Sequence, residues 1–147
     1  MTANLTTNTS VTIDAPIDQV WRAITTPDLI EGWFFGVQTR SDWAPGSDVV
    51  HSGEWEGRPY EDKGVILQIE RPTLLEHTHW SPVSGRPDRP ENYESVTYRL
   101  TERGGKTQIT VSEGNLPSED AKSTSEQGWR MALDALKQLC EDRTAHE

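Results

Sequence analysis

Residues 96–111, VTYRLTERGGKTQITV, and residues 129–140, WRMALDALKQLC, decide the fold. In the first stretch, apolar and polar side chains alternate on both sides of Gly104-Gly105, which predicts a β-hairpin with one inward and one outward face. In the second, apolar residues recur every three or four positions, which predicts a helix with one apolar face. A helix over residues 118–143 would extend roughly 39 Å at 1.5 Å per residue, long enough to cross a whole sheet.

The chain before this hairpin divides into two short helices and a series of strands. An alternation at residues 11–13 predicts the end of an opening strand, Pro16 occupies the first position of a helix, and Thr26 and Gly32 bound a second short helix. From residue 37 to 111 the period is two, and recurring Pro/Gly turn signals divide the segment into about six strands. The alternation of Val65, Leu67 and Ile69 is one of the clearest, and residues 82–92 read as a proline-rich loop.

This order of elements predicts an α+β fold, in which a curved antiparallel sheet of about six to seven strands surrounds the long C-terminal helix. The length favours one domain over residues 1–147. The narrow apolar face of one helix does not fill the concave side of such a sheet. We therefore expect a wedge-shaped cavity between the sheet and the 118–143 helix, suited to a ligand.

The composition is close to that of a disordered chain. Leu, Ile, Val and Phe together make up 28 of the 147 residues, and the net charge is −10. Six tryptophans spread along the chain argue for folding, because each aromatic ring buries roughly 150–250 Å². We therefore expect a folded protein with an economical core.

Charge and cysteine content exclude several functions. A sequence pI near 4.8 without a Lys/Arg cluster argues against nucleic-acid binding. The sequence holds no stretch that predicts a membrane span or a signal peptide, which favours a soluble, cytoplasmic protein. Cys140 is the only cysteine, so an internal disulfide and a multi-cysteine metal site are both impossible. We expect no metal and no cofactor.

Several motifs together resemble the START-like, helix-grip superfamily, and within it the branch of proteins homologous to the activator of the heat-shock chaperone ATPase. The matching pieces, which cover nearly the whole chain, are IDAP at 13–16, VW at 20–21, TTP at 25–27, GWF at 32–34, WAPG at 43–46, GVI at 64–66, PTLLEHTHW at 72–80, PENY at 90–93, VTYRL at 96–100 and GW at 128–129. The resemblance implies the helix-grip fold predicted above.

The superfamily hosts lipid carriers, cyclases and chaperone partners, so the resemblance leaves function open. The favoured interpretation is a protein that binds a small apolar or amphipathic molecule in the cavity, and not an enzyme. A cyclase- or hydrolase-like enzyme that uses cavity histidines as acid and base is the first alternative. A chaperone-interacting regulator is the second, and a homodimer is a further expectation.

The most specific candidates are His77 and His79, two residues apart on a predicted strand and therefore on one face with Leu75. Many relatives in this branch carry an aromatic residue near these positions, so the histidines indicate a more polar cavity wall. They would orient a carbonyl or hydroxyl group, or act as acid and base. Ordinary core or surface roles stay open, and no third residue in the sequence marks a metal site.

Six aromatic residues complete the candidate ligand-binding set, and each has a core-packing alternative: Trp33, Phe34, Trp55, Tyr60, Tyr98 and Trp129. In START-like folds, the segment with Trp33 and Phe34 lies near the cavity mouth. Trp55 stands between two glutamates, which suggests an inward-facing ring near Tyr60. The phenol of Tyr98 would supply a polar anchor, and Trp129 begins the apolar face of the last helix.

Overall fold

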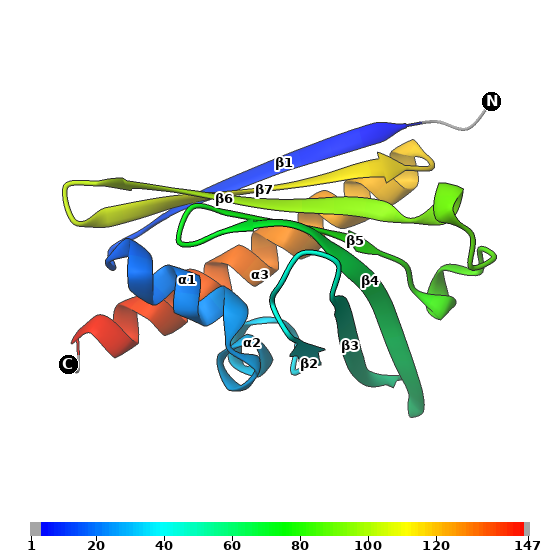
Figure 1. Cartoon of the computed structure of the whole chain (residues 1–147), viewed down its shortest axis with the longest axis horizontal. Coiled ribbons are helices and arrows are strands. Elements are labelled where there is room, and N and C mark those ends of the chain that lie inside the picture. The colour runs from blue at the N-terminus through cyan, green and yellow to red at the C-terminus, as the bar shows by residue number, and fades with distance from the viewer. Residues whose placement is uncertain (1–3, 146–147) are drawn as a thin grey trace.

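The computed structural model describes residues 4–145 and shows a curved antiparallel sheet against a long helix, which confirms the predicted α+β class (Figure 1). The seven strands pair in the order β1-β7-β6-β5-β4-β3-β2. The elements are β1 Leu5–Ile13, α1 Ile17–Thr25, α2 Pro27–Trp33, β2 Gln38–Ser41, β3 Asp48–Trp55, β4 Arg58–Glu70, β5 Leu74–His79, β6 Glu94–Arg103, β7 Lys106–Leu116 and α3 Glu119–Ala145.

The hairpin and the last helix have the predicted form. Arg103 pairs with Lys106 across Gly104 and Gly105, both of which have positive φ, as a two-residue turn of this kind requires. α3 packs against β1 and against α2, with Leu133 and Leu136 fully buried. At 27 residues it extends about 40 Å and crosses the strands, as Figure 1 shows.

The two short helices connect the first strand to the rest of the sheet. Pro16 lies one position earlier than predicted, at the N-cap of α1 in extended conformation. α2 begins at Pro27 and passes Gly32 by one residue. Phe35 and Gly36 then adopt left-handed φ values of 55° and 72°, which turns the chain away from the helix. Such a conformation is uncommon for a side chain as large as phenylalanine.

In β4 the structure corrects the expected orientation of the side chains. Val65 and Leu67 are 36% and 47% exposed, and Ile66 between them faces the core at 1%. The pairing with β5 shifts register between Ile66 and Gln68, and beyond this irregularity Ile69 packs against the core. A bulge changes which face successive side chains occupy, so the sequence alternation alone predicts the wrong face for two of the three residues.

Two segments without a clear apolar pattern have regular structure, and one of them, the proline-rich segment 82–92, is expected from the sequence to be a loop. Leu5 begins β1 within the polar N-terminal stretch; the strand pairs with β7, its Thr7 and Thr9 side chains are buried, and Thr7 contacts Ser125 on α3. The proline-rich loop holds two short 3-10 turns, Pro82–Ser84 and Pro90–Asn92. Pairing with β7 satisfies the backbone of β1, so strand formation there does not depend on apolar side chains.

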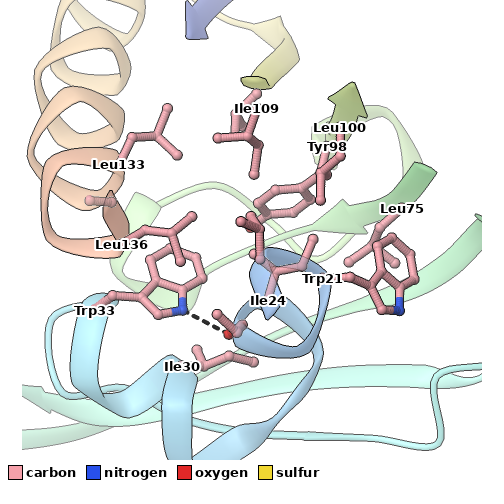
Figure 2. Packing of buried hydrophobic residues seen from close by; sticks show 14 of the residues in the cluster. Trp21, Ile24, Ile30, Trp33, Leu75, Tyr98, Leu100, Ile109, Leu133 and Leu136 are labelled. Atoms are coloured by element: carbon pink, nitrogen blue, oxygen red, sulfur yellow. Dashed lines mark hydrogen bonds between the residues drawn. The ribbon is translucent and has the colours of Figure 1, made fainter. Parts of the chain in front are cut away.

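The hydrophobic core lies between the sheet, α1, α2 and α3 (Figure 2). Trp21, Trp33 and Trp129 are buried in it, and Trp43 packs against its edge. The tryptophans therefore supply much of the core area that the low aliphatic content lacks. None of the helices within residues 4–145 is long and apolar enough to cross a lipid bilayer.

Candidate functional site

A cavity of about 160 Å³ opens between the sheet and α3. One part of its wall is aromatic and aliphatic, and the other carries three histidines, a tyrosine and a glutamate. The lining residues come from strands β3, β5, β6 and β7, from the segment after α2 and from the N-terminal half of α3. They are Phe34, Phe35, His51, His77, His79, Val96, Tyr98, Glu113, Ser125, Gly128 and Trp129. The cavity lies between the same elements as the wedge expected from the sequence.

His77 is a neutral imidazole with an available acceptor nitrogen. Its Nδ1 lies 2.8 Å from the carbonyl oxygen of Thr78, and a carbonyl only accepts, so Nδ1 carries the hydrogen. Burial, with a smaller contribution from the charge of His79, lowers the pKa of His77 to about 4. At neutral pH the other ring nitrogen, Nε2, therefore keeps its lone pair.

His51 is the second neutral imidazole. Its Nδ1 lies 2.9 Å from the hydroxyl of Thr39 on the neighbouring strand β2. Burial, followed by repulsion from His77 and His79, lowers the pKa of His51 to about 3. The rings of His51 and His77 lie 6.1 Å apart, centre to centre, so the two neutral imidazoles line one part of the wall.

His79 is charged, in contrast to its neighbours. Its Nε2 lies 3.1 Å from Asp62 Oδ2, and its Nδ1 lies 3.7 Å from Glu94 Oε2. Burial alone would lower the pKa of His79, but the hydrogen bond to Asp62 and the attraction of both carboxylates outweigh burial and raise the pKa to about 10. Asp62 Oδ1 is buried and has no hydrogen-bond partner among residues 4–145.

Glu113 connects β7 to α3 at the cavity wall. Its Oε1 accepts a hydrogen bond of 2.8 Å from Trp129 Nε1 and one of 2.6 Å from the Ser125 hydroxyl. Nearby, burial and the charge of Glu113 raise the pKa of Tyr98, so its phenol stays protonated. Tyr98 lines the cavity, and no hydrogen bond to its hydroxyl is found within the described residues.

The apolar wall is built from stacked rings. Phe34 stacks on Trp129 with ring centres 5.6 Å apart, and Tyr98 meets Trp129 edge to face at 5.7 Å. Phe35 lines the cavity although it is 60% exposed, which puts it at the open side. An apolar ligand would enter beside this ring and contact the stack behind it.

Of the eight residues predicted from the sequence, the structure brings five together at the cavity: Phe34, His77, His79, Tyr98 and Trp129. Trp33 lies in the core, where its indole N–H donates to the Ala23 carbonyl at 2.9 Å, as Figure 2 shows. Tyr60 is half-buried on β4 and does not line this cavity. The side chain of Trp55 lies outside the described part of the structure.

His51 and Glu113 also line the cavity, although neither is among the residues predicted from the sequence. The strand alternation does carry a signal for both, because His51 shares a face with buried Val49 and Glu113 shares one with buried Ile109 and Val111. Their placement depends on strand pairing: His51 is opposite Asp62 on β4, and Glu113 is opposite Val96 on β6. Ser125 and Gly128 reach the cavity because the N-terminal half of α3 passes over it.

The fold and cavity define a START-like, helix-grip protein. The family model described as "Activator of Hsp90 ATPase homolog 1-like protein" matches residues 14–141, and the chain belongs to this family. No match is found among curated proteins.

Solved structures of similar proteins agree with this assignment. ChR145 from Cytophaga hutchinsonii is 38% identical, with a TM-score of 0.82 over 96% of this chain and 97% of that one. CalU16 from Micromonospora echinospora is 25% identical, with a TM-score of 0.70 over 98% and 90%. Aha1 from Colwellia psychrerythraea, solved in solution as a dimer, shares the fold at 16% identity and a TM-score of 0.74 over 93% and 96%.

Proposed function

We propose that this protein binds a small amphipathic molecule in the cavity between the sheet and α3. The supporting observation is a cavity wall with two chemically different parts. The rings of Phe34 and Trp129 offer an apolar surface, and His77, His79 and Tyr98 offer polar groups opposite. Such a wall fits a ligand with an apolar body and an oxygen-bearing end.

The cavity size limits the enclosed part of the ligand. A volume of about 160 Å³ is close to the roughly 150 Å³ of an engineered protein cavity that holds one benzene molecule. The enclosed part is therefore about one ring in size, and a longer ligand extends past Phe35 into solvent. His77 Nε2 accepts a hydrogen bond from a ligand hydroxyl, and the Tyr98 hydroxyl donates one to a ligand oxygen.

Calorimetric titration and native mass spectrometry against a panel of lipids and polyketides, with phenol as the smallest probe, test this proposal. We expect one ligand per chain and weakening of about 3–10-fold in Tyr98→Phe, since one hydrogen bond contributes about 0.5–1.5 kcal/mol. Tyr60→Phe is the matched control, because it removes a phenol hydroxyl that does not line the cavity. Absence of binding across the panel, or equal weakening in both variants, would contradict the proposal.

An acid/base enzyme is the second candidate, favoured by the different protonation states of the cavity histidines. Neutral His77 has a lone pair to accept a proton, and charged His79 has a proton to donate. On this reading, His77→Ala and His79→Ala each reduce turnover of a polyketide-like substrate by at least about 100-fold. Unchanged turnover in both variants, measured by mass spectrometry of the products, would exclude this role.

The resemblance also leads us to propose a homodimer and a chaperone partner. The family name refers to the ATPase of Hsp90, and the Colwellia relative was solved as a dimer. Light scattering after size-exclusion chromatography tests the first, with a monomer mass as the contradicting result. Pull-down with a bacterial homologue of the chaperone tests the second, and recovery no greater than on empty beads counts against it.

A further inference from the structure

Three potential metal-ligating side chains meet at one end of the cavity. His79 on β5, Glu94 on β6 and Glu113 on β7 each offer a donor atom, and these atoms lie within 4.8 Å of one another. His79 and Glu94 are opposite each other in the β5–β6 pairing. The register of three adjacent strands therefore brings an imidazole and two carboxylates to one point.

Each of the three side chains also forms a hydrogen bond with a residue outside the cluster, and this bond fixes its orientation. His79 Nε2 lies 3.1 Å from Asp62 Oδ2, Glu94 Oε1 accepts a hydrogen bond of 3.0 Å from Arg86, and Glu113 Oε1 accepts one from Trp129. These contacts leave His79 Nδ1, Glu94 Oε2 and the second oxygen of Glu113 as the remaining donors. In metalloproteins, a carboxylate behind a ligating histidine fixes the ring in this way.

We propose that His79, Glu94 and Glu113 form a binding site for a divalent transition-metal ion, with Asp62 as the carboxylate that orients His79. One imidazole and two carboxylates are donors that Zn²⁺, Mn²⁺ and Fe²⁺ accept. Donors about 2.1 Å from a tetrahedral zinc ion lie about 3.4 Å apart. The 3.7 Å between His79 Nδ1 and Glu94 Oε2 needs only a small adjustment to reach that spacing.

Ion binding is balanced in protons and charge. The ion takes the place of the proton on His79 Nδ1, which is released to solvent because a metal-bound histidine is neutral, while Nε2–H continues to donate to Asp62. The two glutamates neutralise the ion. With three protein ligands, a further coordination position is left for water or a ligand oxygen. His79 and Glu113 line the cavity, so this position faces it.

Calorimetric titration of ZnCl₂ into the chelator-treated full chain tests the proposal. We expect one ion per chain, and X-ray absorption at the zinc edge showing nitrogen and oxygen donors without sulfur. Glu94→Gln and Glu113→Gln should each weaken zinc binding by at least about 100-fold, and Asp62→Asn by about 10–100-fold. Glu76→Gln is the matched control and should bind zinc normally, because Glu76 lies on β5 beside His77 and hydrogen-bonds Gln68 and Thr97 outside the cavity.

Circular dichroism of each variant shows whether the fold is kept. If one of the two glutamate variants does not fold, the zinc affinity of the other still tests the site. Zinc binding that is equal in Glu94→Gln, Glu113→Gln and the Glu76→Gln control would overturn the metal site, as would several weakly bound ions per chain. The site does not depend on the organic ligand. The phenol titration is repeated in chelator, where no metal is bound, so that it tests the organic ligand alone. Whether phenol binds or not, the zinc titration still decides the metal site, so the two proposals fail separately.

Discussion

At the scale of single residues, the surroundings of each histidine determine its charge. His77 and His79 lie two residues apart on β5, but carboxylates contact only His79. His77 meets a backbone carbonyl and is enclosed by rings, so burial dominates and its pKa falls to about 4. The contacts of His79 raise its pKa to about 10. Neighbouring residues of one type therefore offer a proton acceptor and a proton donor to the same cavity.

Trp33 allows a test of a core role at this scale. Its ring is 3% exposed, and its indole N–H donates to the Ala23 carbonyl. Trp33→Phe removes that hydrogen bond and part of the ring, so we expect the free energy of unfolding to fall by about 1–3 kcal/mol in urea denaturation. Ligand affinity should stay within about twofold of wild type. An affinity loss without a stability loss would instead assign Trp33 to the site.

At the scale of elements, β4 determines which side chains reach the core. The bulge between Ile66 and Gln68 lets a strand of 13 residues follow the curvature of the sheet. Gly64 allows a close approach of β5, since a Cβ there would lie 1.7 Å from the Thr78 carbonyl oxygen. Because Thr78 separates His77 from His79, this approach also helps to position the histidine wall.

Alanine substitutions on the two faces of β4 test this register. Ile66→Ala removes a buried side chain and should lower the free energy of unfolding by about 2–5 kcal/mol. Leu67→Ala changes an exposed side chain and should lower it by less than about 1 kcal/mol. Urea denaturation of both variants provides the comparison. A larger loss for Leu67→Ala would mean that the opposite face of β4 is buried.

At the scale of the whole molecule, the two ends of the sheet differ. We call strands β1, β7, β6 and β5 the covered half, and strands β4, β3 and β2 the thin half. Strands β6 and β7 have a partner on each side, and α3 packs against β7 and β1. At the other end β2 has four residues and pairs only with β3. His51 on β3 belongs to the thin half, and His77 and Glu113 belong to the covered half. The cavity is therefore lined by strands from both parts of the sheet.

Native-state hydrogen exchange should follow the same division. Amides of β6 and β7 should exchange only through global unfolding, because both strands are paired on each side and one face is buried. Amides of β2 should exchange through a smaller opening, since one edge of this short strand is unpaired. Exchange measured by NMR, residue by residue, tests this. Equal protection of β2 and β7 would contradict it.

The fold and part of the site follow from the sequence by itself. Alternation in residues 96–111 and the apolar face of residues 129–140 determine the hairpin and α3, because local periodicity decides which face of an element is apolar. The same rule identifies His77, His79 and Tyr98 as inward-facing. It fails in β4, because a bulge depends on the partner strand.

Only the tertiary structure decides how distant strands align. The metal-ligating set joins residues from three strands, and His51 reaches the cavity from a fourth. Strand alternation indicates that Glu113 and His51 face inward, but single-strand patterns do not encode cross-strand register, so the sequence does not show that they meet the other site residues. The tertiary structure also decides the charge of each histidine, because the pKa of an imidazole depends on its burial and on the carboxylates that the fold brings close to it.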